Sequence, residues 1–211
     1  MKHTMFGNLM LSLFFLLSPL SAHAQDAGKA QEVLEKTAEA YTRGGGTKIV
    51  FRVSSNEGAS EGTIQLKGKK FVLESEGVKT WFDGKTQWTY LADNGEVNVS
   101  EPKAEELQSI NPYAWLDLYK DGYTLKMGNT SASNQYQVIM TSTKRRQDMQ
   151  CIILFVDKRT FQPTRLSLAG NAGKDVAIVS ILSYQSHLDL DDAMFVFDPG
   201  AYPKAEVIDL R

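Results

Sequence analysis

The chain has 211 residues, a formal net charge of −2 at pH 7 and 42% hydrophobic residues. This length and composition predict a globular protein of about one domain, and the nearly balanced charge gives no support for nucleic-acid binding. The single cysteine, Cys151, excludes an internal disulfide, and its apolar flanks predict a buried strand thiol.

The first residues are typical of a secretory signal peptide. An apolar run from Leu9 to Leu17 is followed by Ser18-Pro19, and Ala22-His23-Ala24 is a small-x-small cleavage signal. The run is too short for a good membrane span. We therefore predict a signal peptide at 1–24 and a single domain at 25–211, which begins with glutamine rather than a lipoprotein cysteine and is expected to be soluble.

Residues 26–46 predict one amphipathic helix. Asp26 is a plausible N-cap, and Gly44-Gly45-Gly46 ends the pattern. Apolar and small side chains recur between these limits at helical spacing, at Ala30, Val33, Leu34, Thr37, Ala38 and Tyr41.

From Thr47 onward, hydrophobic residues alternate with polar ones, as in strands with one buried face. The alternation involves Ile49/Phe51/Val53, Ile64/Leu66, Phe71/Leu73, Tyr136/Val138/Met140, Ile152/Leu154/Val156, Leu166/Leu168 and Ile178/Leu182/Tyr184. Turn signals such as Asn94-Gly95 and Asp121-Gly122 separate these runs. About ten short strands in meander order predict a mainly β fold, with one antiparallel sheet curled into a barrel or half-barrel.

A short helix is expected between two blocks of strands, in "SINPYAWLDLYKDGY". Asn111 can cap it and Pro112 suits its first position, while Trp115, Leu118 and Tyr119 share one side. Together with the first helix, it can cover an open concave face of the sheet.

The stretch "KTWFDGKTQWTY" predicts a hairpin with a two-residue type I′ turn at Asp83-Gly84. This register places Trp81, Trp88 and Tyr90 on one face and Phe82 on the other, mixed face. The three rings either fill a barrel core or line a cavity that an apolar ligand enters.

Catalytic and metal-binding patterns are weak. The predicted mature chain has one histidine, His187, so His-based metal sites and Ser-His-Asp triads have little to build on. We expect no enzyme, metal or cofactor, and the missing Ser/His/Asp signals disfavour a lipid hydrolase. Asp189, Asp191 and Asp192 indicate a solvated turn rather than a cation site. Lys144-Arg145-Arg146 indicates an exposed turn or a docking contact for an acidic partner.

The order of these motifs resembles the LolA-like periplasmic carriers of outer-membrane lipoproteins. The resemblance is carried by the leading helix, by "WFDGKTQWTYLADNGEVNVS", by "NPYAWLDLY" and by the ending "DLDDAMFVFDPGAYPKAEVIDL". It implies an unclosed antiparallel β-barrel, or half-barrel, capped by helices. Where many members of this family have an arginine followed by proline, which latches the lid, this chain has Gly68-Lys69-Lys70, which indicates a different gate or cargo.

The resemblance implies a monomeric periplasmic carrier of acylated lipoproteins. An inner-membrane transporter would release the cargo to this carrier, and an outer-membrane acceptor would receive it. A lipid- or lipoprotein-sensing module with a regulatory partner is the alternative. The expected ligand-binding side chains of the hydrophobic cavity are Ile49, Phe51, Val53, Ile64, Leu66, Phe71, Leu73, Trp81, Trp88, Tyr90, Trp115 and Leu118.

Overall fold

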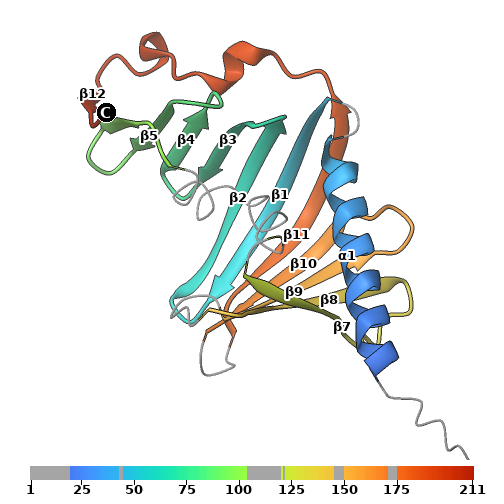
Figure 1. The fold of residues 1–211 in the computed structure, drawn as a ribbon. Coiled ribbons are helices and arrows are strands. Elements are labelled where there is room, and N and C mark those ends of the chain that lie inside the picture. Colours follow the sequence, from blue (N-terminus) through green and yellow to red (C-terminus); the bar gives the residue numbers. More distant parts are fainter. Residues whose placement is uncertain (1–19, 43–44, 104–119, 121, 145–149, 171–174) are drawn as a thin grey trace, which may run out of the picture.

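A computed structural model describes residues 20–42, 45–103, 120, 122–144, 150–170 and 175–211 (Figure 1). The predicted signal peptide lies almost wholly outside these residues, as do the inserted helix with Trp115 and Leu118, and Arg145 and Arg146. The described elements are α1 (Leu20–Thr42), β1 (Gly46–Ser55), β2 (Gly58–Lys67), β3 (Lys70–Ser75), β4 (Val78–Phe82), β5 (Gln87–Leu91), β6 (Glu96–Ser100), β7 (Tyr123–Met127), β8 (Gln135–Ser142), β9 (Cys151–Asp157), β10 (Pro163–Ala169), β11 (Asp175–Leu188), the 3-10 helices η1 (Asp192–Phe195) and η2 (Pro199–Ala201), and β12 (Glu206–Asp209).

All described strands belong to one sheet in the order β12-β6-β5-β4-β3-β2-β1-β11-β10-β9-β8-β7. Neighbouring strands pair antiparallel, apart from β12, which runs parallel to β6. Among the described residues, β12 and β7 are the two edges, so the sheet does not close (Figure 1). This architecture confirms the predicted mainly β fold with an unclosed barrel, and β7 and β12 raise the strand number above the ten expected.

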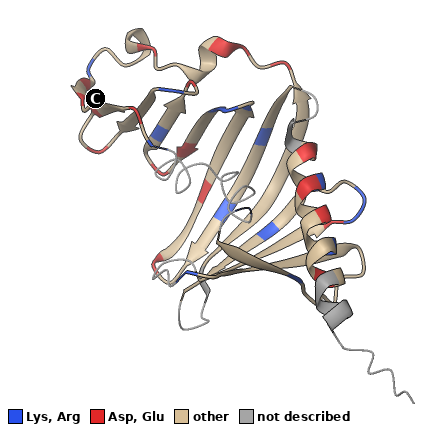
Figure 2. Cartoon of the chain, viewed as in Figure 1, with Lys and Arg blue, Asp and Glu red and all other residues tan. Residues whose placement is uncertain are grey.

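Helix α1 confirms the predicted amphipathic helix. Ala30, Val33 and Leu34 are fully buried on the side that faces the sheet, while charged residues are dense along the helix as a whole (Figure 2). The hydroxyl of Thr37, also buried, donates a hydrogen bond of 2.8 Å to the carbonyl of Val33. The helix begins at Leu20, ahead of the expected cap at Asp26, and therefore includes the last residues of the predicted signal peptide.

Strand β11 departs from the predicted alternation at a β-bulge. Phe51 pairs with Ile181 and the preceding Val50 pairs with Ser183, so Leu182 is an extra residue. A bulge shifts the side-chain alternation by one position. As a result, Ile181 joins Tyr184 on the apolar face, whereas Leu182, expected on that face, is 47% exposed.

The hairpin between β4 and β5 is connected by residues 83–86, so the predicted two-residue turn is wrong. The Asp83 carboxylate accepts hydrogen bonds of 2.8 Å from the backbone N–H groups of Lys85 and Thr86, which stabilises the longer loop. Trp81 consequently pairs with Trp88. Two added residues preserve the parity, so Trp81, Trp88 and Tyr90 do share a face.

That face is covered by the C-terminal segment, residues 189–211, which runs from β11 to the far edge of the sheet (Figure 1). The Trp81 ring contacts the rings of Phe197 and Tyr202 edge-on, with centroids 5.4 and 5.5 Å apart, and Tyr90 lies 4.7 Å from Tyr202. We call the buried residues here the C-terminal cluster. They are Val72, Trp81, Val97, Phe195 and Phe197.

Two lysines hold the start of this segment against the sheet. Lys67 Nζ donates to the Leu190 carbonyl at 2.7 Å and lies 2.9 Å from one Asp192 carboxylate oxygen, and Lys70 Nζ lies 2.8 Å from the other. Asp191 caps η1 by accepting from the Ala193 N–H at 3.0 Å. The acidic turn is therefore an anchor for the C-terminal segment.

Trp81→Ala should lower the free energy of unfolding by about 3 to 5 kcal/mol, because it removes a ring that is only 5% exposed and leaves a cavity beneath the segment. Denaturant unfolding followed by circular dichroism measures the change. Val78→Ala on the same strand is the control, since Val78 is 39% exposed and its loss should cost less than about 0.5 kcal/mol. Equal losses for the two variants would contradict the packing described.

Asp192→Asn should destabilise the attachment of the segment in a pH-dependent manner. Hydrogen bonds from Lys70 and then Lys67 lower the pKa of Asp192 from 3.8 to about 2. Because the folded-state pKa is depressed, the stabilisation is complete above the unfolded pKa and is lost as pH falls through the folded one. The difference in the free energy of unfolding between wild type and Asp192→Asn should thus be constant from about pH 5 to about pH 8 and vanish as the pH falls below about 2. A salt concentration of about 1 M should reduce this difference, because salt screens the ion pairs.

Candidate functional site

The face of the sheet that carries α1 is apolar across most of the strands. Directly paired residues of neighbouring strands point to the same face, so the register identifies its side chains. One row crosses from β7 to β1 through Met127, Val138, Leu154, Leu166, Val179 and Val53. A second row crosses from β11 to β4 through Tyr184, Ile49, Ile64, Leu73 and Thr80.

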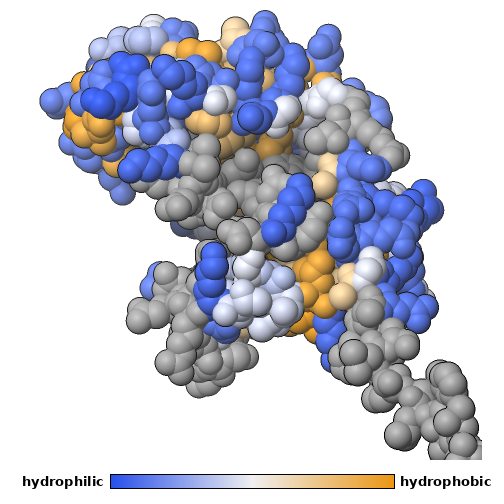
Figure 3. All heavy atoms as spheres, viewed as in Figure 1, coloured by the Kyte–Doolittle hydropathy of each residue, from blue (hydrophilic) through white to orange (hydrophobic). Residues whose placement is uncertain are grey.

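Under α1, this face forms the helix-side cluster, in which α1 packs against β7 and β8 and the cluster continues into β9 and β10. Its buried members are Ala30, Val33, Leu34, Tyr123, Val138, Met140, Ile152, Leu154, Val156 and Leu166. Figure 3 shows hydrophobic atoms at the surface beside α1. The helix therefore covers only part of the apolar face.

Farther along the same face lies the floor cluster, with the buried members Ile49, Ile64, Leu66, Phe71 and Phe82. The Phe71 and Phe82 rings tilt against each other with centroids 5.3 Å apart. Half-buried hydrophobic side chains pack on this floor and remain partly accessible, namely Phe51, Leu73, Ile181 and Tyr184.

Gly62 allows the Phe51 ring to lie close over β2. A Cβ atom at position 62 would come 2.5 Å from the Phe51 ring and 2.9 Å from the Glu74 carbonyl oxygen. Both distances are shorter than van der Waals contact, and the carbonyl belongs to the rigid backbone of β3. Glycine at this position therefore leaves room for the Phe51 ring over β2.

Tyr184 is a polar group in the apolar surroundings of the floor cluster. Burial raises the pKa of its phenol from 10.0 to about 12, and a hydrogen bond with Thr47 acts in the opposite direction. The phenol is therefore neutral at physiological pH. Its ring can contact hydrocarbon while its hydroxyl keeps a polar partner.

Seven of the twelve expected ligand-binding residues lie together on this face. They are Ile49, Phe51, Val53, Ile64, Leu66, Phe71 and Leu73. Trp81, Trp88 and Tyr90 were expected on the same wall, and the register corrects this: Trp81 pairs with Val72 and lies on the opposite face from Phe82. Trp115 and Leu118 lie outside the described residues.

Sequence reasoning missed Phe82, Val179 and Ile181, which belong to the apolar face. Phe82 is only 4% exposed, although its strand neighbours suggested a half-solvated face. The pairing of Phe71 with Phe82 across β3 and β4 was the available signal. Ile181 was hidden by the bulge, for which the alternation alone gives no sign.

The chemistry of this face is that of hydrocarbon contact. Its accessible side chains offer dispersion and hydrophobic burial, with the Tyr184 hydroxyl as a polar exception. Within the described ranges, no group of three His, Cys, Asp or Glu residues is placed to hold a metal ion. No described helix has the length and apolarity needed to cross a membrane.

Comparisons with known proteins agree with this geometry. A solved structure of an uncharacterized conserved protein from Thermus thermophilus has a TM-score of 0.64 and 16% identity, covering 86% of this chain and 99% of that one. A DUF1329 family protein from Desulfovibrio piger has a TM-score of 0.51 and 12% identity, covering 84% and 99%. Both likenesses show the fold.

An uncharacterized protein of Methanocaldococcus jannaschii is 21% identical over 202 residues, which cover 90% of this chain. The chain spans 58% of the length of that relative. The model of the family described as "Outer membrane lipoprotein carrier protein LolA" matches residues 20–172, which is well over half of the chain. The chain therefore belongs to the LolA outer-membrane lipoprotein carrier family.

Proposed function

We propose that the protein is a periplasmic carrier that binds the acyl chains of lipoproteins and delivers them to the outer membrane. The observation that supports this most directly is the floor cluster, with Phe51, Leu73 and Ile181 lying half-exposed around a buried apolar floor. Single exposed hydrophobic residues are common on globular proteins, but a contiguous group of them marks an interaction site or a ligand-binding groove. A continuous apolar face that one helix covers in part is suited to a hydrocarbon guest.

The energetics of acyl chains explain the need for such a carrier. An acyl chain of about 14 methylenes loses on the order of 11 kcal/mol of favourable burial when it moves into water, at about 0.8 kcal/mol per methylene. Spontaneous crossing of an aqueous compartment would therefore be very slow. Apolar walls remove most of that barrier without making or breaking a bond.

Release requires that the empty carrier be nearly as stable as the loaded one. Half-buried side chains meet this requirement, since they can pack on one another when no guest is present. The phenol of Tyr184 and the flat ring of Phe51 can cover a chain without fixing one register. The same face can then accept cargoes whose acyl chains differ.

The proposed carrier works between two membranes. The predicted signal peptide at 1–24 supports export, and the family supports a route from an inner-membrane releasing transporter to an outer-membrane acceptor. Both partners, the monomeric state and the periplasmic location are parts of this proposal.

Ile181→Ser should weaken the binding of a fluorescent fatty-acid probe about tenfold, because it places a hydroxyl on the apolar wall and removes methylene contacts. Fluorescence titration of the purified mature protein measures the dissociation constant. The matched control is Leu182→Ser, the next residue on β11, which has no partner on β1 and is 47% exposed.

The control variant should bind the probe as the wild type does. If Leu182→Ser lost as much affinity as Ile181→Ser, or if neither variant changed it, the probe would not be bound on the proposed face. Circular dichroism and unfolding curves for both variants separate a binding defect from misfolding.

The carrier function itself is tested by mixing the mature protein with spheroplasts and identifying what leaves the membrane in complex with it. We expect acylated lipoproteins in the released complex, and much less with Ile181→Ser. The proposal fails if the protein releases no more lipoprotein than an inert protein of similar size does.

A further inference from the structure

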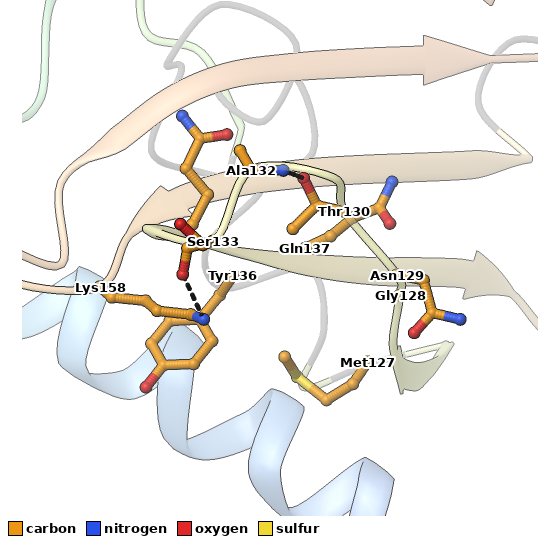
Figure 4. A pocket seen from close by; sticks show the side chains of 10 residues that line it. Met127, Gly128, Asn129, Thr130, Ala132, Ser133, Tyr136, Gln137 and Lys158 are labelled. Atoms are coloured by element: carbon orange, nitrogen blue, oxygen red, sulfur yellow. Dashed lines mark hydrogen bonds between the residues drawn. The ribbon is translucent and has the colours of Figure 1, made fainter.

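A polar pocket of about 280 Å³ lies beside the helix-side cluster (Figure 4). It is formed by the connection between β7 and β8, the start of β8 and Lys158, which follows β9. Its lining residues are Met127, Gly128, Asn129, Thr130, Ala132, Ser133, Gln135, Tyr136, Gln137 and Lys158. The apolar face described above does not account for this pocket.

The lining is rich in uncharged hydrogen-bonding groups and has one cation. Two aliphatic hydroxyls and three side-chain amides contribute both donors and acceptors. All ten lining residues lie in the described chain, and none of them is Asp or Glu. Such a lining favours a ligand that has hydroxyl groups and a negative charge.

The cation is held in a defined position. Lys158 Nζ donates a hydrogen bond of 2.7 Å to the Ser133 carbonyl and lies 5.4 Å from the centroid of the Tyr136 ring. Figure 4 shows the Lys158 side chain reaching along that ring toward Ser133. An ammonium has three N–H donors, so the bond to Ser133 leaves donors for a ligand oxygen.

The pocket adjoins the helix-side cluster. Met127 and Tyr136 line the pocket and also pack against the helix-side cluster. On the side of α1, Lys29 Nζ lies 5.6 Å from the same Tyr136 ring and 2.9 Å from the Glu32 carboxylate. A ligand in the pocket would therefore place its polar part beside Lys158 and its next atoms toward the helix-side cluster.

We propose that this pocket binds the phosphate-bearing, hydroxylated head group of an anionic phospholipid, such as phosphoglycerol, with the acyl chains on the apolar face. The inference rests on the proposed function in that the same face would hold the chains. It extends that function, because the acylated terminus of a lipoprotein has no phosphate for Lys158. Anionic phospholipid would then be a second cargo or a co-ligand.

The test uses the mature protein and vesicles that contain equal amounts of phosphatidylglycerol and phosphatidylcholine with identical acyl chains. After separation, mass spectrometry quantifies the lipids bound to the protein. We expect phosphatidylglycerol to be enriched about fivefold, and Lys158→Gln to reduce the enrichment to about onefold with the total bound lipid unchanged. Lys204→Gln, a change of an exposed lysine in the C-terminal segment, should keep the enrichment.

Equal binding of the two lipids by the wild type, or full enrichment in Lys158→Gln, would overturn the head-group site while leaving the carrier function intact. If neither lipid binds, a phospholipid cargo is overturned, the carrier proposal still depends on the spheroplast experiment, and the pocket is judged by soluble probes alone. Glycerol 1-phosphate should then shift the backbone NMR signals of Ser133 and Lys158, and Lys158→Gln should abolish the shifts. No shift, or an equal affinity for inorganic phosphate, would contradict a head-group site.

Discussion

The pairing of β1 with β11 determines the rest of the structure. These strands are far apart in the sequence, yet their contact joins the block β2–β6 to the block β7–β10 in one sheet. In a strand, a slip of one residue exchanges the two faces. The bulge at Leu182 sets the register so that Val179, Ile181 and Tyr184 meet Val53, Phe51 and Ile49. The continuous apolar face exists only in this register.

The two faces of the sheet are closed in different ways. The C-terminal segment covers β3–β6 on one side with aromatic contacts, and its Phe195 is fully buried against the sheet. On the other side, α1 covers β7 and β8, and side chains on β1, β3 and β11 remain half-buried. The face under the C-terminal segment is thus covered by packed aromatic rings, whereas the face that carries α1 keeps partly accessible hydrocarbon.

Much of the fold follows from the sequence because its signals are local. The alternation of Ile49, Phe51 and Val53 is strong enough to identify the buried face of β1, and helical spacing identifies Val33 and Leu34. The placement of Trp81 could not be predicted in this way. Local parity gives the neighbours that share its face, but only the partner strand and the C-terminal segment decide which side of the sheet that face is.

The bulge on β11 shows the same limit, because in "AIVSILSYQ" both Ile178/Leu182/Tyr184 and Val179/Ile181 alternate. The extra residue Leu182, between the partners of Val50 and Phe51, decides which set faces β1's apolar side. Because β1 is far away in the sequence, the alternation within β11 does not reveal this bulge.

The departure at Gly68-Lys69-Lys70 now has a structural reason. Lys70 and its neighbour Lys67 bind Asp192 from both sides, so the turn between β2 and β3 holds the C-terminal segment. Two flexible ammonium groups on different strands can bind one carboxylate from two sides, whereas one planar guanidinium would bind it from a single strand. In this chain, the basic side chains at the turn therefore attach the C-terminal segment, which covers the face opposite to the apolar one. Among the described residues, a gate over the proposed acyl-binding face would therefore involve α1 and the packing of Phe51, Leu73 and Ile181, rather than a latch at this turn.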